Sequence, residues 1–289
     1  MVIFSKNRAC QLDQLLRSLS EHLEERHLFA ITVLYVADDA EFSDAYKIVE
    51  HQFKFVAFIE QRTDQTIGQQ IHNIIVDSRK EFFCMLVDDD ILIRKLSLHS
   101  PQFDTFRQNV GISSLSIRLS PSITYCQPLL IAERPPRINS DGVFHWYATP
   151  FWRLVRDVSV LLGQTGLGVG DWAVSMSMDG NFFRLAEFRE YFRRLPEIRD
   201  FGDIEGAMVH VPIPKEYGIC FAEAKLINVP LNSVRTDYSY PNMAIDATYL
   251  NSLFMSGARL DYRHLCSINS FSCHVEVAPR WIESHEANC

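Results

Sequence analysis

The segment FFCMLVDDDIL at residues 82–92 limits the possible folds most strongly, because six apolar residues lead directly into three carboxylates. An apolar run of this length is typical of a strand that is buried on both faces of a parallel sheet. The carboxylates of Asp88, Asp89 and Asp90 would then lie at the carboxyl end of that strand, where open α/β sheets bind their ligands. Adjacent negative charges at the rim of an apolar sheet predict a divalent cation with oxygen ligands, itself carrying a diphosphate.

The composition is that of a soluble globular protein and argues against a nucleic-acid partner. Of 289 residues, 47% are hydrophobic and 22% are charged, so the chain can bury a sizeable core. The net charge is −8 and no run of five basic residues occurs. A surface that binds nucleic acid needs clustered Lys and Arg to neutralise phosphates. A single nucleotide remains compatible with this charge, because a metal ion would supply positive charge locally.

Nothing in the sequence predicts a membrane-spanning or secreted chain, and we expect a cytoplasmic location. No stretch approaches the roughly 20 apolar residues that cross a bilayer. Lys6 and Arg8 follow the first apolar run, which is not the order found in a secretory signal peptide. Seven irregularly spaced cysteines do not form the pattern of a disulfide framework. A zinc site at Cys266, Cys273 and His274 is not supported either, because no Cys-x-x-Cys pair is present.

The first hundred residues alternate between strand and helix patterns. Such an order requires right-handed crossovers, and it predicts a mostly parallel sheet with helices on both faces. The polar residues 5–8, 38–39 and 88–90 each follow a predicted strand, so a parallel sheet would bring all three groups to one edge. We expect strands at 2–5, 29–36, 53–59 and 82–87, and helices at 9–26, 45–49 and 67–75, the last capped by Thr66 or Asp64.

The second half of the chain is less regular than the first. A strand is expected at 111–117, a long loop at 119–142, and helices around 188–195, 204–211 and 243–254. No repeat, low-complexity tract or clear linker is present. We therefore expect one domain over residues 1–289, with a regular part at 1–95 and an elaborated part at 96–289.

Several segments together resemble nucleotide-sugar-dependent glycosyltransferases with the GT-A fold, and are similar to bacterial members of family 2. The resemblance is good over residues 1–92 and patchy afterwards. It implies a GT-A-like α/β fold, with nucleotide binding by residues 1–95 and acceptor binding by residues 96–289. The segments that carry it are SKNR at 5–8, QLDQLLRSL at 11–19, VDDD at 87–90 as an Asp-x-Asp motif, SMDGNFFR at 177–184 and NVPLN at 228–232.

The resemblance implies a cation, Mn²⁺ or Mg²⁺, that neutralises the charge developing on the diphosphate leaving group. Asp90 would ligate this metal, Asp88 would contact the metal through a bound water or contact the ribose, and His274 is a further candidate ligand. In an extended chain Asp88 and Asp90 point to one side and Asp89 to the other. Two alternatives remain: the three aspartates cap a following turn or helix, and His274 is structural.

The same resemblance implies a nucleotide-binding set at the ends of the first two strands. Ser5 and Arg8 match the first nucleotide-contacting loop, and Asp38 matches the acidic position that recognises the base. Asp39 is an equally placed neighbour, and Asp88 and Asp89 complete the set. Arg8 and Asp38 are expected outside the core. The alternatives are a helix N-terminal loop at 5–8 and a turn at 38–39. The polar residues Gln69, Gln70 and Asn73 are interpreted as a solvated helix face in preference to diphosphate ligands.

An inverting enzyme of this fold needs an Asp or Glu that deprotonates the acceptor hydroxyl. The candidates are Glu205, Asp203 and Asp179. Glu205 and Asp203 have an alternative role as N-terminal charges that complement a helix dipole. Asp179 has an alternative role in binding the donor or acceptor sugar. The aromatic residues His145, Trp146, Tyr147, Phe151 and Trp152 line an acceptor groove or, more commonly for such residues, belong to the core.

The leading hypothesis, implied by the resemblance, is a metal-dependent glycosyltransferase of the hexosyltransferase type, acting in polysaccharide biosynthesis. It would transfer a sugar from a nucleoside-diphosphate donor to a glycan, lipid-linked or protein acceptor. A lipid-linked acceptor would bring the chain to a membrane surface as a peripheral protein. One alternative is a nucleotidyltransferase that makes nucleotide sugars, although those usually have a Gly-rich basic loop where residues 5–8 stand. Another is a non-catalytic nucleotide- or glycan-binding module. The donor, the acceptor, the stereochemical outcome and the oligomeric state stay open.

Overall fold

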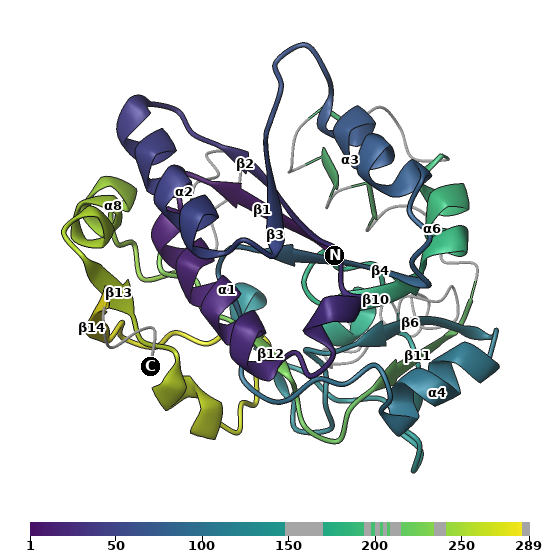
Figure 1. Cartoon of the computed structure of the whole chain (residues 1–289). Coiled ribbons are helices and arrows are strands. Elements are labelled where there is room, and N and C mark those ends of the chain that lie inside the picture. The colour runs from purple at the N-terminus through teal and green to yellow at the C-terminus, as the bar shows by residue number, and fades with distance from the viewer. Residues whose placement is uncertain are drawn as a thin grey trace.

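The computed structural model describes residues 1–147, 170–193, 198–199, 203–204, 207–208, 215–233 and 241–284. Within these residues the centre of the molecule is an eight-stranded sheet with the order β3-β2-β1-β4-β10-β6-β11-β9 (Figure 1). Its strands in chain order are β1 (Val2–Lys6), β2 (Ile31–Val36), β3 (Val56–Glu60), β4 (Phe82–Val87), β6 (Ile112–Ser116), β9 (Val143–His145), β10 (Asn181–Arg184) and β11 (Tyr217–Cys220).

The predicted mostly parallel arrangement is confirmed. Strand β1 lies parallel to both β2 and β4, and β2 lies parallel to β3, so the carboxyl ends of these strands meet at one edge. Strand β10 runs antiparallel between β4 and β6, whereas β11 is parallel to β6 and β9 is antiparallel to β11. Strand β10 lies in the segment 177–184, for which the sequence pattern predicts no strand.

Helices cover both faces of the sheet, as expected (Figure 1). One apolar cluster joins one face to α1 (Ala9–His22), α2 (Ala40–Gln52), α4 (Pro101–Gln108) and α8 (Ala247–Met255). A second cluster joins the other face to α3 (Ile67–Val76) and α6 (Leu185–Phe192). Thr66 and Gln69 form a capping box at the start of α3, which confirms Thr66 as the cap. No helix within the described residues is long and apolar enough to cross a membrane.

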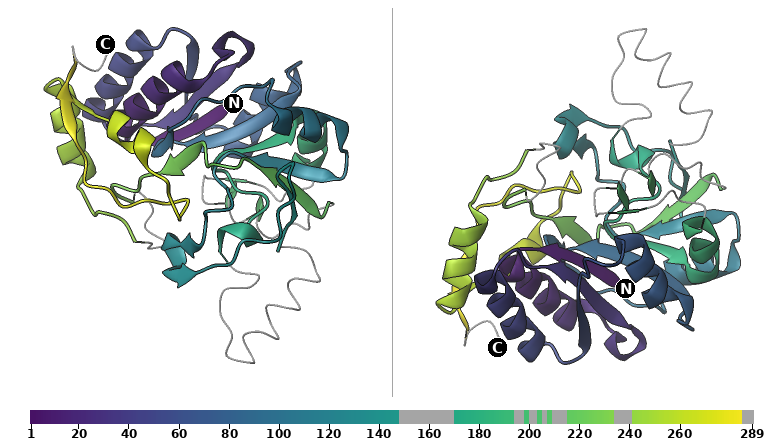
Figure 2. Two further views of the ribbon diagram at one scale, coloured as in Figure 1. Left: turned by 90° about the horizontal axis from the view of Figure 1, so that it is seen from below. Right: turned by 90° about the horizontal axis from the view of Figure 1, so that it is seen from above.

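Three short two-stranded pairs accompany the central sheet among the described residues. They are β5 (Asp90–Leu92) with β12 (Leu226–Asn228), β7 (Tyr125–Cys126) with β8 (Ile131–Ala132), and β13 (Ala258–Leu260) with β14 (Trp281–Glu283). The described residues also form the short 3₁₀ helices η1 (Arg26–Leu28), η2 (Gln127–Leu129), η3 (Asp171–Ala173) and η4 (Arg263–Ser267). Both views in Figure 2 show the segment that carries α8 and β13 beside α1 and α2. These two helices are far from that segment in the sequence.

A third apolar cluster lies under the elaborated part of the chain. Trp146 and Trp172 are completely buried in it, and Tyr147 and Phe144 are nearly so. The indole of Trp146 donates to Ser113 Oγ over 3.0 Å. Trp146 and Tyr147 therefore belong to the core and do not line a groove, while His145 stacks against Tyr217 with ring centroids 4.2 Å apart. Phe151 and Trp152 lie outside the described residues.

Candidate functional site

The loop after β1 and the end of β4 meet at the carboxyl edge of the sheet, because the two strands are parallel neighbours. The hydroxyl of Ser5 donates to Asp88 Oδ2 over 2.8 Å, and the Lys6 amide donates to the same oxygen over 3.3 Å. The guanidinium Nη1 of Arg8 donates to the other oxygen of Asp88, Oδ1, over 3.0 Å. Both oxygens of the buried Asp88 carboxylate are therefore engaged within the protein.

Arg8 is an internal counter-ion for two of the three aspartates. Its Nη1 also donates to Asp89 Oδ2 over 3.1 Å, and its Nη2 donates to the main-chain carbonyl of Asn232. The expectation that Asp89 points away from Asp88 is wrong, because residues 88 and 89 form a turn between β4 and β5. The expectation that Arg8 lies outside the core is also wrong, since Arg8 is only 6% exposed.

Asp90 begins strand β5 and is completely buried. Its Oδ2 accepts from the Val87 amide over 3.0 Å, and its Oδ1 accepts from Asn228 Nδ2 over 3.3 Å. The same amide of Asn228 donates to Asp89 Oδ1 over 2.7 Å. Asn228 reaches both carboxylates because it is the register partner of Asp90 in the β5–β12 pair. The sequence analysis assigned no role to Asn228, although its segment was among those that carried the resemblance.

Asp179 and His274 lie on the other side of Asp90. Asn228 forms a main-chain bridge with His274, and His274 Nε2 lies 3.9 Å from Asp179 Oδ2. Arg118 Nη1 donates to that same oxygen of Asp179 over 3.2 Å. The structure therefore places the predicted ligand His274 beside the predicted catalytic residue Asp179, and Asn228 links His274 to the strand that Asp90 begins.

Burial governs the electrostatics of these carboxylates. It raises the pKa of Asp88 above its ordinary value, with the guanidinium of Arg8 opposing the shift and the charge of Asp89 adding to it. Burial also raises the pKa of Asp90 well above its ordinary value, and the neighbouring charge of Asp179 raises it further. A cation placed between Asp90 and Asp179 would offset both effects, because it favours the charged form of each carboxyl.

The carboxylates of Asp90 and Asp179 suit Mn²⁺ or Mg²⁺, which bind oxygen ligands, and a nitrogen ligand such as His274 suits Mn²⁺ better than Mg²⁺. The buried Nδ1 of His274 has no hydrogen-bond partner among the described residues. Within the described part of the chain, no three His, Cys, Asp or Glu side chains lie close enough to hold a metal ion by themselves. These residues thus fit a cation that takes most of its ligands from a diphosphate and water, as Mg²⁺ commonly does.

The acidic residues after β2 have two different environments. Asp38 is exposed, with its Oδ2 accepting from Asn7 Nδ2 over 2.8 Å and lying 3.3 Å from the ammonium of Lys6. Asp39 is the N-cap of α2, where its carboxylate accepts from the Phe42 amide over 2.9 Å. Asp38 is therefore the better placed of the two to meet a ligand at the edge of the sheet.

The other predicted residues lie away from this cluster or outside the described residues. Asp203 is exposed, and its carboxylate accepts from the Arg199 amide over 3.0 Å. Glu205 lies outside the described residues. On α3, Gln69 belongs to the capping box and Asn73 is exposed. The expected solvated face is wrong for Gln70, which is buried and accepts from the Arg62 amide over 3.1 Å.

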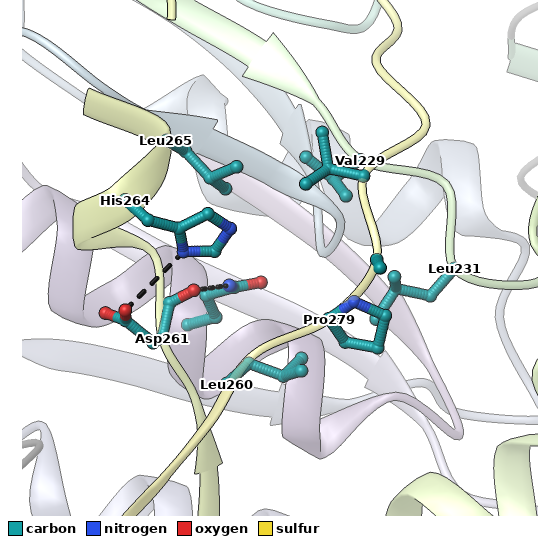
Figure 3. A pocket seen from close by; sticks show the side chains of 10 residues that line it. Val229, Leu231, Leu260, Asp261, His264, Leu265 and Pro279 are labelled. Atoms are coloured by element: carbon teal, nitrogen blue, oxygen red, sulfur yellow. Dashed lines mark hydrogen bonds and ion pairs between the residues drawn. The ribbon is translucent and has the colours of Figure 1, made fainter. Parts of the chain in front are cut away.

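A small hollow near the C-terminal segment is too small to be a substrate site. Its volume is about 10 Å³, roughly enough for a single water molecule. In Figure 3 the imidazole of His264 points into the hollow, with Nδ1 lying 3.5 Å from Asp261 Oδ2. The other residues that line it are Gln14, Val229, Leu231, Leu260, Leu265, Val277, Ala278 and Pro279.

Comparison with known proteins agrees with the resemblance drawn from the sequence. No family model matches the chain. A curated relative, the bifunctional glycosyltransferase pgtA of Dictyostelium discoideum, is 26% identical over 133 residues, which cover 44% of this chain and 17% of pgtA. The chain thus spans less than a fifth of that relative.

Solved structures of glycosyltransferases are also found. TarS 1-349 of S. aureus matches 78% of this chain and 59% of its own, with 12% identity and a TM-score of 0.46. The mannosyltransferase PcManGT of Pyrobaculum calidifontis, solved with GDP-Man and Mn²⁺, matches 45% of this chain and 42% of its own, with 10% identity and a TM-score of 0.32. The chain is an α/β protein with a mostly parallel sheet, and it is similar to glycosyltransferases over part of its length.

Glu133 is another buried acid, and it lies close to Asp171. Its carboxylate packs against Gly170, where a Cβ would overlap it, and faces the main-chain N–H groups of Asp171 and Trp172. Burial and the charge of Asp171 raise the pKa of Glu133 to about 8. The folded state therefore holds a proton on Glu133 at neutral pH that the unfolded state releases.

We expect the Glu133→Gln variant to lose part of the pH dependence of stability. With a pKa raised from 4.5 to about 8 on folding, the free energy of unfolding falls as pH rises between these values, by at most about 1.4 kcal/mol per pH unit. Glutamine has no proton to lose, so this fall is absent from the variant. The difference in the free energy of unfolding, variant minus wild type, should therefore be larger at about pH 8 than at about pH 6. Urea unfolding at both pH values measures this, with Glu50→Gln on the exposed face of α2 as the control. Identical pH slopes in Glu133→Gln and wild type would contradict it.

Proposed function

We propose that this chain is a metal-dependent glycosyltransferase that transfers a hexose from a nucleoside-diphosphate sugar. The observation that carries the proposal is the arrangement around Asn228, which donates to Asp90 and bridges to His274, with His274 Nε2 lying 3.9 Å from Asp179 Oδ2. Asp90 follows the carboxyl end of β4. This end is where an open α/β sheet binds a nucleotide, and where a leaving diphosphate needs positive charge. The acceptor is a glycan, a lipid-linked sugar at a membrane surface, or a protein.

The nucleotide would lie along the ends of β1, β2 and β4. The exposed carboxylate of Asp38 is placed to accept hydrogen bonds from the base, next to the ammonium of Lys6. Ser5 and Arg8 act by holding Asp88 and Asp89 in the turn that faces the ligand. Residues 1–95 thus serve the donor, and residues 96–289 of the same domain supply Asp179, His274 and the acceptor side.

A cation would be held by Asp90 and His274, with Asp179 beside them. Asp88 would act on it indirectly, through a bound water or the ribose, since the guanidinium of Arg8 already neutralises its carboxylate. When bound, the cation supplies positive charge for the departing diphosphate. The buried amide of Asn228 keeps Asp90 and Asp89 in place whether or not the cation is present.

We expect Mn²⁺ and a nucleoside diphosphate to bind cooperatively. Asp90, Asp179 and His274 do not complete a coordination shell, so each ligand should bind weakly until the other is present. Calorimetric titration of UDP and of GDP, with Mn²⁺ and with a chelator, measures the coupling, and thermal stabilisation gives a second readout. Equal nucleotide affinity with metal and with chelator would contradict the metal role.

The enzymatic part of the proposal is tested with two donors. TarS was solved in complex with UDP-GlcNAc and PcManGT with GDP-Man, so these are the first donors to try. Transfer, or slow release of UDP or GDP without an acceptor, supports a glycosyltransferase. Binding of both donors without turnover of either, across glycan and lipid-linked acceptors, would indicate a non-catalytic binding module.

A further inference from the structure

Arg118 joins two carboxylates that come from different segments of the chain. It follows β6 and is 4% exposed. Its Nη1 lies 3.2 Å from Asp179 Oδ2, and its Nη2 lies 3.1 Å from Asp171 Oδ1. A planar guanidinium can donate to two carboxylates in fixed directions, which the single ammonium of a lysine cannot do. The sequence pattern assigned no role to either Arg118 or Asp171.

The Asp171 end of this bridge is anchored in the core. Asp171 opens η3 and is 4% exposed, and the next residue, Trp172, is completely buried. The indole of Trp172 donates to the Ile123 carbonyl over 3.0 Å, which fixes the turn against the chain that follows β6. Asp171 therefore holds one side of the guanidinium in place, and the other side is left to orient Asp179.

Asp179 needs a fixed positive partner such as Arg118 because it lies near another carboxylate, Asp90. Asp179 precedes Gly180, whose amide donates to the Met85 carbonyl over 3.0 Å, so Asp179 lies at the end of β4, where the turn that leads to Asp90 begins. Two like charges in a buried site repel each other, so without a fixed cation Asp179 would turn away from Asp90. His274 Nε2 lies 3.9 Å from Asp179 Oδ2, beyond ordinary hydrogen-bond length, whereas Arg118 Nη1 donates to that oxygen over 3.2 Å.

We propose that Arg118, anchored by Asp171, is a positioning residue for sugar transfer, which holds the Asp179 carboxylate facing Asp90. Arg118 acts through Asp179 and Asp171 acts through Arg118, so the three form one unit. The inference deepens the proposed function and rests on it. It assigns to the elaborated part of the chain the task of orienting a carboxylate at the donor site.

The test uses Arg118→Lys, Asp171→Asn and the double variant in the full chain. Each single variant should release nucleoside diphosphate from UDP-GlcNAc or GDP-Man about 10- to 100-fold more slowly, the usual effect of removing a partner that orients a ligating group. Affinity for UDP or GDP in the presence of chelator should change by no more than about 3-fold, since nucleotide binding does not use this unit. The double variant should be no slower than the worse single variant, because both changes disable the same unit.

Arg17→Met is the matched control. Arg17 is 6% exposed and its Nε donates to Asp13 over 2.9 Å, on helix α1 away from Asp179. It should lower the melting temperature and leave turnover unchanged at temperatures where the variant is folded. Unchanged turnover in Arg118→Lys beside an active wild type would overturn the positioning role and leave the proposed function standing.

A structural measurement keeps the inference testable whatever the wild-type turnover. A crystal structure of Arg118→Lys should show the Asp179 carboxylate rotated away from Asp90, and Arg17→Met should not. An Asp179 carboxylate in its original place in Arg118→Lys would overturn the inference even if no donor is ever found. Failure of the wild type to bind UDP or GDP would instead count against the proposed function.

Discussion

Replacing Arg8 by methionine is expected to lower the free energy of unfolding by about 3–5 kcal/mol, the usual effect of removing one partner from a buried ion pair. The guanidinium contacts the carboxylates of Asp88 and Asp89 at 3.0 and 3.1 Å, and all three side chains are nearly inaccessible to solvent. Methionine fills similar space but leaves two buried negative charges uncompensated. Urea unfolding at neutral pH measures the change.

Two further variants separate charge from packing in this prediction. Adding Asp88→Asn and Asp89→Asn to Arg8→Met removes the charges that lost their partner, and should recover much of the stability. Asp38→Ala, at a side chain that is 54% exposed, should change stability by less than about 0.5 kcal/mol while weakening UDP or GDP binding. A midpoint for Arg8→Met equal to that of the wild type would show that Arg8 is not the counter-ion of these aspartates.

Replacing Glu205 by glutamine is expected to slow sugar transfer at least ~100-fold, the scale for loss of a general base. The base acts on the acceptor hydroxyl while the sugar transfers, so donor affinity should be spared. Steady-state turnover, paired with calorimetric titration of the donor, measures both quantities. Glutamine keeps the shape of the side chain and removes its charge.

Asp179→Asn and Asp203→Asn identify the base by contrast. Asp179→Asn should reduce turnover and also weaken the coupling between Mn²⁺ and nucleotide, because Asp179 lies against Asp90. Asp203→Asn should have little effect, since its exposed carboxylate already accepts from the Arg199 amide. A fully active Glu205→Gln beside an inactive Asp203→Asn would transfer the role to Asp203. Full activity in all three variants would favour a retaining reaction, or a base elsewhere.

The elements that the sequence predicted correctly are those set by local patterns. Strand β4 has the predicted bounds, Phe82–Val87, because a buried apolar run that stops at charged residues defines both of its ends. The first helix was expected to continue to residue 26 but ends at His22. Leu23 instead bridges to Leu96, and the Glu24 amide donates to the Leu96 carbonyl over 3.1 Å. A contact across more than seventy residues overrides the helical periodicity there.

The candidate site was predicted only in part, for the same reason. Asp88, Asp90 and Asp179 were candidates because they lie in segments that carry the resemblance, and His274 was a further candidate outside those segments. Arg118 and Asn228 were missed because a single buried polar residue has no periodic signal, and its partners are distant in sequence. Arg8 was found but misplaced, since its contact with the Asn232 carbonyl spans 224 residues. Charge alone does not show whether an arginine faces a ligand or the interior.

The pairing of β5 with β12 has a consequence for how the protein matures on the ribosome. Asp90 and Asn228 are 138 residues apart, so the three carboxylates leave the ribosome long before the amide that holds two of them. Arg8 is already available by then and can neutralise Asp88 and Asp89, whereas Asp90 must wait for the distal strand. Closure of such a long loop is slow. The carboxyl edge of the sheet, where the nucleotide would bind, should therefore be the last part of the molecule to become native. A nascent chain would then show a protease-resistant sheet before it gains any affinity for nucleotide.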